Sequence, residues 1–472
     1  MNFNDEEHWY DGETMDSVHR YEDMMKNHHR YFFDIHEFEN IIDYYLDIEN
    51  LTQAAQVADY ASHLYPSSSS IQFRMAEIMI DNGQPTKALA LLNELEKLET
   101  GEYTVHLLKG AALNVLGKAR EAQRQFEKAI ALADEDKAQV LYDIGVSFER
   151  INQYKMALQY FLKVRAIEPD NYYIYYDLAF CCDRINDLDS SIAYYKKYLD
   201  EDPFAEYAWY NLGIVYNRKE DDEKAIEAYD YALAIYPEYT SALFNKANTL
   251  TLLNKTEEAI ETYNDFLRIE PDNAAVHCYL GECHEKNHDY DCATQYFQKS
   301  LSLDNTFADA WFGMGIMNAD CGRFEESVRC LKHAIALDKD NEEYLFGLAT
   351  TYINLQQFDK ANVLLDGLLQ KTTDDEVMWC MYAHTFAQQE QYADAQRITT
   401  KGLQYNPDSA LLRYHLAAYY LLNDDRLKGL TILEESLRKH PEDVDIFFEV
   451  FDREDNLNDE VMALVNAYRK NP

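Results

Sequence analysis

The feature that most constrains this chain is a spacing of 34 residues that recurs along it. Successive prolines in one stretch lie 34 residues apart, a second pair keeps the same spacing, and 136 residues, four times 34, separate the two groups. Self-similarity at such a period is typical of repeat architectures, in which each unit buries its apolar face only against its neighbours. The prolines that carry the spacing are Pro169, Pro203, Pro237, Pro271, Pro407 and Pro441.

Twelve full units fit one register when Glu206 is taken as position 1 of the unit 206–239. They cover residues 35–443, with one extra residue between the units that begin at 103 and 138. Each unit has the apolar pattern of two amphipathic helices separated by a polar turn, with recurrences at i, i+3, i+4 and i+7. A proline beyond the second helix ends it in several units. The units begin at residues 35, 69, 103, 138, 172, 206, 240, 274, 308, 342, 376 and 410.

Two columns of this register hold small side chains. Position 20 is Ala, Ser or Gly in all twelve units, and position 8 is Ala or Gly in every unit except the first, which has Ile42. Glycine inside a helix costs about 1 kcal/mol relative to alanine, so its recurrence at position 8 predicts a packing reason. We expect the two helices to cross closely there, with the large side chains of positions 4 and 24 around the crossing. The glycines at position 8 are Gly110, Gly145, Gly213, Gly281 and Gly315.

Together these columns resemble the tetratricopeptide repeat, and the resemblance covers nearly the whole chain. It implies an all-α fold, a right-handed α-solenoid (superhelix) of antiparallel helix pairs. It also implies that the first helices line a concave wall with positions 2, 5, 6, 9, 12 and 13, and that the protein is a non-enzymatic binding scaffold. The unit at 206 matches the family pattern at all eight columns, with Trp209, Leu212, Gly213, Tyr216, Ala225, Tyr229, Ala232 and Pro237.

The ends of the chain depart from the register. Residues 1–34 form an acidic N-terminal extension in which we expect a disordered first dozen residues and a capping helix from residue 13 to residue 33, with residues 31–33 covering Ile41 and Ile42. Residues 444–472 are a degenerate thirteenth repeat that we expect to act as a C-terminal cap. Ala463 takes the small position of its second helix, whereas Phe451 at position 8 is too large for the usual crossing.

Two columns of the concave wall are candidates for contacting a partner. Position 5 is rich in aromatic residues between 138 and 260, where added rings and Asn amides predict a rim of anchors for an extended segment. Position 13 carries arginines that could receive a partner's carboxylates. Each column has a second explanation, because the rings can pack between first helices and the arginines can pair with neighbouring acids. The candidate groove residues are Tyr142, Tyr173, Tyr176, Phe180, Tyr207, Tyr210, Asn211, Phe244, Asn245, Asn248, Arg150, Arg184 and Arg218.

The charge of the chain limits its partners. With 85 acidic and 43 basic side chains the net charge is −42, which argues against nucleic acid and against anionic membrane surfaces. The acidic residues gather at turns, where they either form a solvated surface or steer a partner with a basic segment. No apolar stretch reaches the ~20 residues of a membrane span, the start does not resemble a secretory signal, and scattered cysteines suit a reducing compartment. We therefore expect a cytoplasmic protein.

No metal, cofactor or catalytic residue is expected. His284 and His288 lie at i, i+4 near Cys283 and Cys292, but zinc needs converging ligands, and in the repeat register these side chains should diverge. The chain has no phosphate-binding loop, dinucleotide fingerprint, nucleophile elbow or HExxH motif. No block larger than ~35 residues lies outside the repeats, which leaves no room for an enzyme domain.

The sequence therefore predicts a scaffold or adaptor that binds a peptide or a partner helix of another protein in the groove of the superhelix. Two alternatives stay open: a self-associating structural subunit of a larger assembly, and a regulatory or accessory subunit of an enzyme on another chain. The partner cannot be named from the repeats, because they specify a shape and a shape does not name a function.

Overall fold

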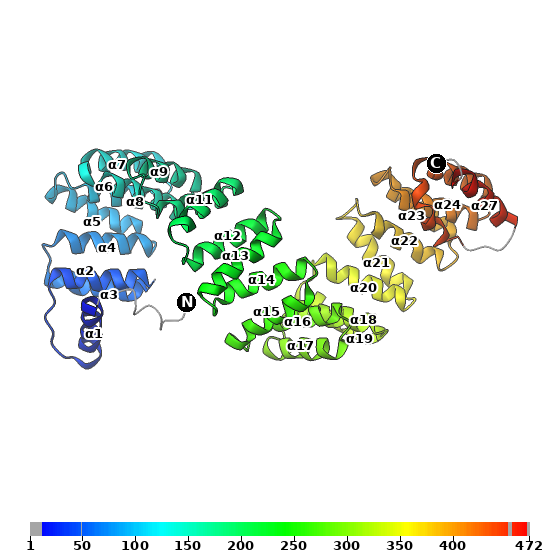
Figure 1. Ribbon diagram of the computed structural model, residues 1–472, viewed down its shortest axis with the longest axis horizontal. Coiled ribbons are helices and arrows are strands. Elements are labelled where there is room, and N and C mark those ends of the chain that lie inside the picture. Colours follow the sequence, from blue (N-terminus) through cyan, green and yellow to red (C-terminus); the bar gives the residue numbers. More distant parts are fainter. Residues whose placement is uncertain (1–11, 49, 452–455, 470–472) are drawn as a thin grey trace. The chain divides into compact units, whose positions relative to one another are not determined.

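The computed structural model describes residues 12–48, 50–451 and 456–469, and in these ranges it contains α-helices and short 3-10 turns but no strand. The chain divides into two compact units, Met1–Ala242 and Leu243–Pro472. In both units successive antiparallel helix pairs stack on one another (Figure 1). The predicted all-α array of helix pairs is confirmed.

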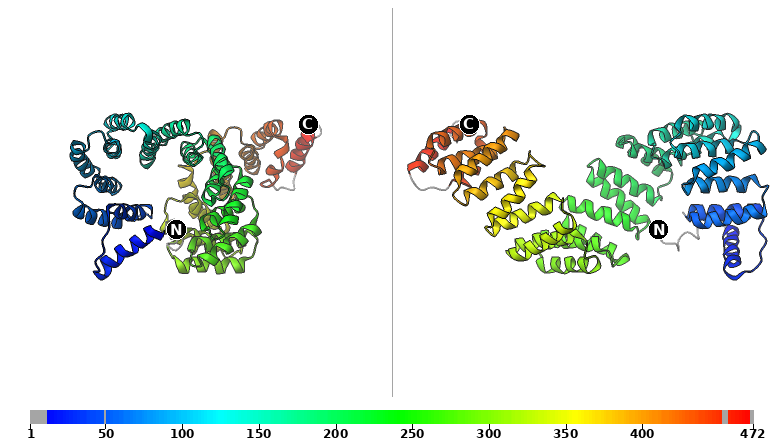
Figure 2. Two further views of the ribbon diagram at one scale, coloured as in Figure 1. Left: turned by 60° about the vertical axis from the view of Figure 1, so that its left-hand side comes forward. Right: turned by 180° about the vertical axis from the view of Figure 1, so that it is seen from behind.

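The helices of the first unit begin almost where the register places them. In the left view of Figure 2 its hairpins follow a curved path. The extra residue before the unit at 138 is accommodated in the 3-10 turn η2 (Asp134–Asp136). The helices are α1 (Gly12–Asn27), α2 (Ile35–Asp47), α3 (Leu51–Leu64), α4 (Ser69–Asp81), α5 (Pro85–Leu98), α6 (Tyr103–Val115), α7 (Ala119–Leu132), α8 (Lys137–Arg150), α9 (Tyr154–Ile167), α10 (Ile174–Arg184), α11 (Leu188–Glu201), α12 (Glu206–Arg218) and α13 (Asp222–Ile235).

The second unit continues the same pairs and ends in two irregular helices. The boundary between the units falls inside α14 (Thr240–Leu252). The turn η3 (Pro441–Asp443) precedes the irregular end. The further helices are α15 (Thr256–Ile269), α16 (Ala274–Lys286), α17 (Tyr290–Leu303), α18 (Ala308–Asp320), α19 (Phe324–Leu337), α20 (Glu342–Asn354), α21 (Phe358–Leu369), α22 (Glu376–Ala387), α23 (Tyr392–Tyr405), α24 (Ala410–Leu422), α25 (Arg426–Lys439), α26 (Asp445–Phe448) and α27 (Asn456–Arg469).

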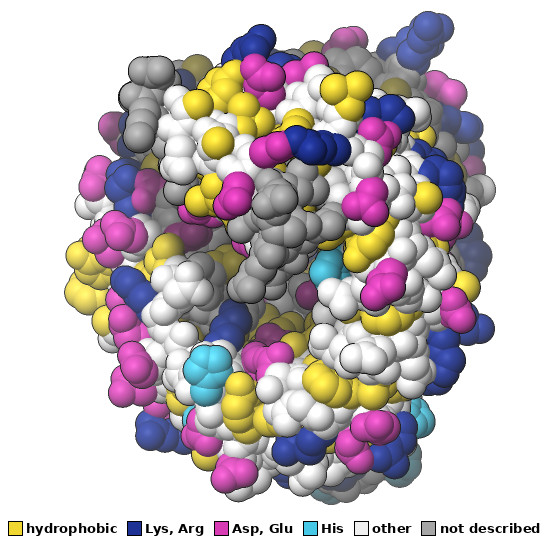
Figure 3. Space-filling model, turned by 90° about the vertical axis from the view of Figure 1, so that its right-hand side faces the viewer, with side chains coloured by type: hydrophobic (Ala, Val, Ile, Leu, Met, Phe, Trp, Pro, Cys, Tyr) yellow, Lys and Arg dark blue, Asp and Glu magenta, His cyan; other side chains and the backbone are white. Residues whose placement is uncertain are grey.

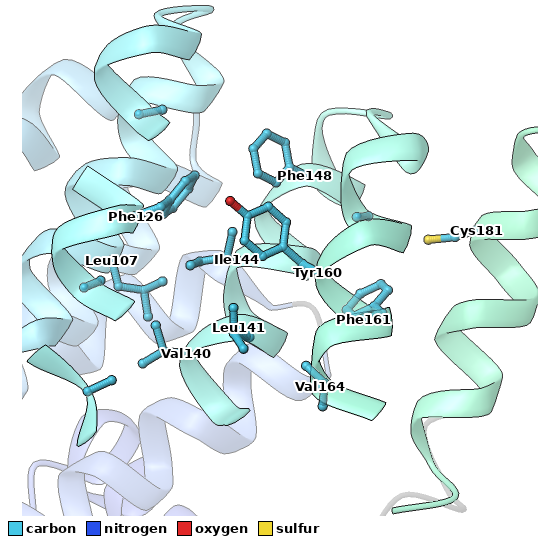
Figure 4. Packing of buried hydrophobic residues seen from close by; sticks show 14 of the residues in the cluster. Leu107, Phe126, Val140, Leu141, Ile144, Phe148, Tyr160, Phe161, Val164 and Cys181 are labelled. Atoms are coloured by element: carbon cyan, nitrogen blue, oxygen red, sulfur yellow. The ribbon is translucent and has the colours of Figure 1, made fainter. Parts of the chain in front are cut away.

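The small residue at position 8 makes room for the large residue at position 24 of the same repeat. A methyl group built on Gly213 would lie 2.4 Å from the ring of Tyr229, and one on Gly145 would lie 2.4 Å from the ring of Phe161. The one exception in the column is compensated, because Ile42 is paired with Ala58 at position 24 and both are buried. Rings of this kind form the continuous core between α7, α8 and α9 (Figure 4).

The turn inside each repeat has a shared backbone conformation. The residue at position 15 has a positive φ in eleven units, and the twelfth, Glu49, lies outside the described residues. Only three of the eleven are glycine, so side-chain-bearing residues adopt the left-handed region in the other eight. They are Gly83, Gly117, Asn152, Asn186, Glu220, Asn254, His288, Gly322, Gln356, Glu390 and Asp424.

The N-terminal helix covers the first repeat. α1 buries Val18 and Tyr21 in the same cluster as Ile41 and Ile42. The helix ends at Asn27, and of residues 31–33 only Phe33 enters the cluster, since Tyr31 is exposed and Phe32 is 77% exposed. The expectation that all three cover the first repeat is therefore wrong. The expected disorder of the first dozen residues falls on residues 1–11, outside the described residues, and residue 12 already belongs to α1.

The C-terminal end leaves the repeat register. Its first helix, α26, has only one turn, and Phe447 and Phe451 stack with ring centroids 4.9 Å apart. α27 packs through Val461 and Val465, which are fully buried, whereas Ala463 is exposed. The assignment of Ala463 as a small crossing residue is therefore wrong, because the helix is turned so that its valines face the core.

None of the described helices is both long enough and apolar enough to pass through a membrane. On the face shown in Figure 3, acidic and basic side chains are interspersed and do not form a patch of one sign.

Candidate functional site

A groove of about 1250 Å³ is formed by the first helices of four successive repeats, α2, α4, α6 and α8. Its lining residues fall mainly at positions 2, 5, 6, 9, 12 and 13, which are the positions that the family resemblance assigns to the concave wall. α6 contributes an apolar stripe, and the helices on either side of it contribute most of the charged residues. The stripe consists of Leu107, Leu108, Ala111 and Val115, and Phe73 and Val146 extend it onto α4 and α8.

Both arginines that line this groove are held by carboxylates of the same face. Arg74 on α4 lies 2.8 Å from Asp43 on α2 and 3.2 Å from Glu77. Arg150 on α8 lies 2.6 Å from Asp81 on α4. These contacts neutralise the two cations, so the arginines are not free to receive an acidic partner.

The carboxylates of the groove outnumber the cations that could neutralise them. Burial raises the pKa of Asp43 and of Asp81 even though an arginine opposes the shift in each case. Burial also raises the pKa of Asp143, which the amide of Gln139 partly relieves. A positive group that entered the groove would favour the charged form of these carboxylates.

The excess of carboxylates continues beyond the groove, from α8 to α10. Burial and the nearby charge of Glu149 raise the pKa of Asp177 to about 7, and Tyr142 opposes this by donating a hydrogen bond to Asp177. Burial raises the pKa of Glu149 as well. Tyr142, one of the predicted contact residues, thus lines the groove and uses its hydroxyl within the wall.

The predicted aromatic residues of α10 and α12 come together, but mostly with one another. The ring of Tyr176 meets that of Tyr207 at 5.2 Å, and its hydroxyl accepts a hydrogen bond of 2.8 Å from the amide of Asn211. The hydroxyl of Tyr207 bonds to that of Tyr198. Tyr210 packs 4.9 Å from Tyr239.

Two further predicted aromatic residues of this region differ in their surroundings. Tyr173 lies just before α10, stacks on Tyr172 at 4.1 Å and is 62% exposed, so it offers a ring to a partner. Phe180 lies edge-on to Tyr154 at 6.0 Å.

The predicted arginines beyond the groove are also engaged internally. Arg218 forms an ion pair with Asp183 and donates a hydrogen bond of 2.9 Å to Asn186. The guanidinium of Arg184 lies over the ring of Tyr154, 5.4 Å from its centroid. The Arg218–Asp183 pair is of the kind that the second explanation describes, in which position 13 pairs with neighbouring acids, whereas Arg184 contacts an aromatic ring instead.

The last three predicted residues lie in the second unit, on α14. Phe244 packs against Phe266 and Tyr279, with centroids 6.2 and 5.7 Å away. Asn248 accepts a hydrogen bond of 2.6 Å from the hydroxyl of Tyr263, and the carbonyl of Asn245 accepts one of 2.8 Å from Thr249.

A group of metal-ligating side chains converges at the turn between α16 and α17. One ligand atom each of His284, Asp289 and Cys292 lies within 4.8 Å of the others. The expectation that His284 and Cys292 diverge is therefore wrong, because the positive φ of His288 folds the turn back on itself. His288 takes no part in this group; its Nδ1 lies 3.0 Å from the hydroxyl of Tyr290.

A buried cysteine and histidine that the sequence did not single out also meet. Sγ of Cys380 lies 2.6 Å from Nδ1 of His415. Burial raises the pKa of Cys380 to about 12 and lowers that of His415 to about 4. A thiolate is the reactive form of cysteine, so this pair is neutral and unsuited to nucleophilic chemistry.

The sequence of the chain matches known repeat families over most of the array. Two tetratricopeptide repeat families match, one at residues 107–172, 142–206 and 183–240 and the other at 219–280. The middle TPR-like domain of cilia and flagella-associated protein 70 matches residues 279–405. The chain is a tetratricopeptide repeat protein. Tetratricopeptide arrays are typically non-enzymatic scaffolds, and the repeats of this chain support a general role in protein interaction.

Individual relatives of this tetratricopeptide repeat protein are distant. N-alpha-acetyltransferase 16, a NatA auxiliary subunit of Mus musculus, is 22% identical over 147 residues, which are 31% of this chain and 17% of the mouse protein. The match therefore spans less than a fifth of that relative's length.

Solved structures of other tetratricopeptide repeat proteins resemble parts of the chain. One from Parabacteroides merdae is 20% identical, covers 52% of this chain and 97% of its own, and has a TM-score of 0.45. YrrB, described as having an unusual peptide-binding site, is 23% identical, with coverages of 39% and 95% and a TM-score of 0.35. The APC/C hetero-tetramer Cut9–Hcn1 is 13% identical, with coverages of 92% and 98% and a TM-score of 0.40.

Proposed function

We propose that this tetratricopeptide array is a non-enzymatic scaffold that holds an extended segment of a protein partner in the groove of α2, α4, α6 and α8. The observation that carries the proposal is the groove itself, whose volume of about 1250 Å³ exceeds the ~300–1,000 Å³ of most small-molecule pockets. Its apolar stripe on α6 offers packing for side chains of the segment, and the neighbouring helices offer polar contacts.

The charges of the groove favour a segment with basic side chains. Both lining arginines are already paired, and Asp143 is a groove carboxylate whose pKa burial raises. A Lys or Arg of the partner would restore favourable electrostatics at such a carboxylate, and the net charge of −42 would speed its approach.

A pair of synthetic peptides tests the charge preference. A fluorescent peptide of alternating Leu and Arg and its Leu and Glu counterpart are titrated against the full chain at two salt concentrations. We expect the basic peptide to bind, with an affinity that falls as salt rises, and the acidic peptide to bind at least ~10-fold more weakly. Equal binding of both peptides would contradict the proposal.

Matched variants locate the binding. Asp143→Asn in the groove should lower the affinity for the basic peptide. Asp200→Asn, which replaces an exposed carboxylate on α11, should leave this affinity unchanged. Leu108→Ser should also weaken binding of the basic peptide, because it removes an apolar side chain from the stripe on α6. If instead Tyr173→Ala is the variant that abolishes binding, the predicted aromatic region before α10, and not the groove, is the contact surface.

A further inference from the structure

Three positions of the repeat formed by α16 and α17 meet in space, and this repeat differs from its sisters at two of them. Position 11 is apolar in ten of the other eleven units and Asn318 in one, but in this repeat it is His284. Position 19 is polar in ten of the other eleven units, but here it is Cys292, the single cysteine in that column. Position 16 holds Asp289, as it holds an aspartate in three other units. Both departures therefore occur in one repeat, beside a carboxylate.

In two of the three sister repeats that have an aspartate at position 16, the same three positions hold a cation. In the repeat of α12 and α13, the ammonium of Lys224 forms an ion pair with Asp221 and lies over the ring of Tyr216. In the repeat of α24 and α25, Lys428 lies 2.9 Å from Asp425 and over the ring of Tyr420. The turn thus builds a cation site from positions 11, 16 and 19, with the cation supplied by the lysine.

The α16–α17 repeat keeps the carboxylate of this site and replaces the lysine. Nδ1 of His284 lies 3.4 Å from Oδ2 of Asp289, and one ligand atom each of His284, Asp289 and Cys292 lies within 4.8 Å of the others. One oxygen of Asp289 also accepts a hydrogen bond of 3.3 Å from the backbone of Cys292, which fixes the carboxylate. The His284 ring is held by stacking on Tyr296, with centroids 5.2 Å apart.

We propose that His284, Asp289 and Cys292 bind a zinc ion at this turn. Imidazole nitrogen, carboxylate oxygen and thiolate sulfur are the three ligand types that zinc takes in proteins. Tetrahedral zinc places ligand atoms about 3.5 Å apart, a spacing close to the 3.4 Å between Nδ1 of His284 and Oδ2 of Asp289. The ligand atoms lie within 4.8 Å of one another, so they need to approach by at most about 1.3 Å to surround the ion. The Cys292 thiol releases its proton to solvent on binding.

The site is accessible, and three ligands leave a fourth position. The His284 side chain is 17% exposed and that of Asp289 is 47% exposed, so an ion can enter from solvent. The ion would join the end of α16 to the start of α17, and water or a partner's side chain would complete its coordination. This inference does not depend on the groove in the first unit.

Cobalt titration of the full chain, after treatment with a chelator, tests the site. Cobalt(II) bound to thiolate gives a near-ultraviolet charge-transfer absorption, which we expect to saturate at one equivalent and to disappear when zinc is added. Zinc should also raise the thermal unfolding midpoint of the chain. Absence of the thiolate absorption would overturn the proposal.

Two variants and a control assign the ligands. The double variant His284→Tyr with Cys292→Lys recreates the residues of the α12–α13 turn, so it should fold without metal and lose both the absorption and the response to zinc. Cys292→Ser should lose the absorption and lower the affinity for zinc at least tenfold. Cys321→Ser, a second partly exposed thiol in the same unit, should behave as the wild type. Absorption that survives Cys292→Ser, or that Cys321→Ser removes, would overturn the assignment.

Discussion

Arg150 on α8 donates a hydrogen bond of 2.6 Å to Asp81 on α4, although the two residues are 69 positions apart in sequence. Both occupy position 13 of their repeats, and the intervening repeat contributes Val115 at the same position. The contact therefore links alternate repeats across an apolar side chain. It requires the first helices of the second, third and fourth repeats to lie close together on the groove side.

The pair is expected to stabilise the curvature of the groove by a modest amount. Arg150→Ala should lower the free energy of unfolding by up to ~1 kcal/mol, because the pair is partly exposed. A double-mutant cycle with Asp81→Asn, measured by urea unfolding, should give a coupling of about 0.5–1 kcal/mol that falls with added salt. The matched control, Arg268→Ala, removes an exposed pair within one helix and should change little. A coupling of zero would mean that the contact does not hold the alternate repeats together.

Gly213 and Tyr229 should be coupled through their packing. Gly213→Ala places a methyl group 2.4 Å from the Tyr229 ring, so the variant should be destabilised by about 1–3 kcal/mol despite the better helix propensity of alanine. Tyr229→Leu should recover part of this loss in the double variant, because Ala76 with Leu92 forms the corresponding pair in the second repeat. Thermal unfolding of the four proteins checks the prediction, and equal losses in the single and double variants would contradict it.

The repeat register predicted this pairing because it acts within one unit, where sequence distance fixes spatial distance. The column of small residues at position 8 and the rings at position 24 are both visible in the sequence. The exception at position 8, Ile42, is explained by the small Ala58 at position 24 of the same unit. The face of the first helices that lines the groove followed from the family resemblance in the same way.

The location of the groove could not be predicted, because it depends on contacts between repeats. Arg150 looked like a binding residue until the structure placed Asp81 beside it. Position 5 of the first three units holds Glu39, Phe73 and Leu107, which share no chemical property that would indicate a binding surface. All three nevertheless line the groove. The convergence of His284 with Cys292 depends on the turn between them, in which His288 has a positive φ. Because histidine adopts many backbone conformations, its presence in the sequence did not indicate this turn.

The turn column offers a test of backbone strain. Glu390 has a φ of 58° at position 15, where Gly83, Gly117 and Gly322 stand in other repeats. Glu390→Gly should raise the free energy of unfolding by about 0.5–1 kcal/mol, because the left-handed region penalises a Cβ. The same change at Glu261, exposed in the middle of α15, should lower it by about 1 kcal/mol. Urea unfolding compares the two, and a loss of stability in Glu390→Gly would contradict the strain argument.

The eight cysteines should differ in reactivity according to burial. Cys292 and Cys321 are partly exposed, whereas Cys380 is buried beside His415 with its pKa raised to about 12. With chelator present at pH 8, a disulfide reagent should modify two thiols quickly and the other six only on the timescale of unfolding. Cys292→Ser and Cys321→Ser should each remove one fast thiol. Fast reaction of Cys380 would show that the Cys380–His415 pair is accessible after all.

The raised pKa of Asp177 should make the stability of the first unit depend on pH. The pKa is about 7 in the folded chain and ~3.9 in an unfolded one, so between these values the folded state binds more protons. The contribution of Asp177 is therefore most favourable below about pH 4 and is lost as pH rises towards 7. Asp177→Asn imitates the protonated form and still accepts the hydrogen bond of Tyr142.

This variant should exceed the wild type in stability at both pH values, and its gain should be larger at pH 8 than at pH 5 by on the order of 1–3 kcal/mol. Glu149 faces Asp177 and adds to the repulsion at high pH, so Glu149→Gln should produce a smaller gain in the same direction. Asp170→Asn, an exposed carboxylate in the preceding loop, is the control and should give the same small difference at both pH values. Urea unfolding at pH 5 and pH 8 measures these differences. A gain for Asp177→Asn that is equal at the two pH values would show that its cause is packing and not the charge of the buried carboxylate.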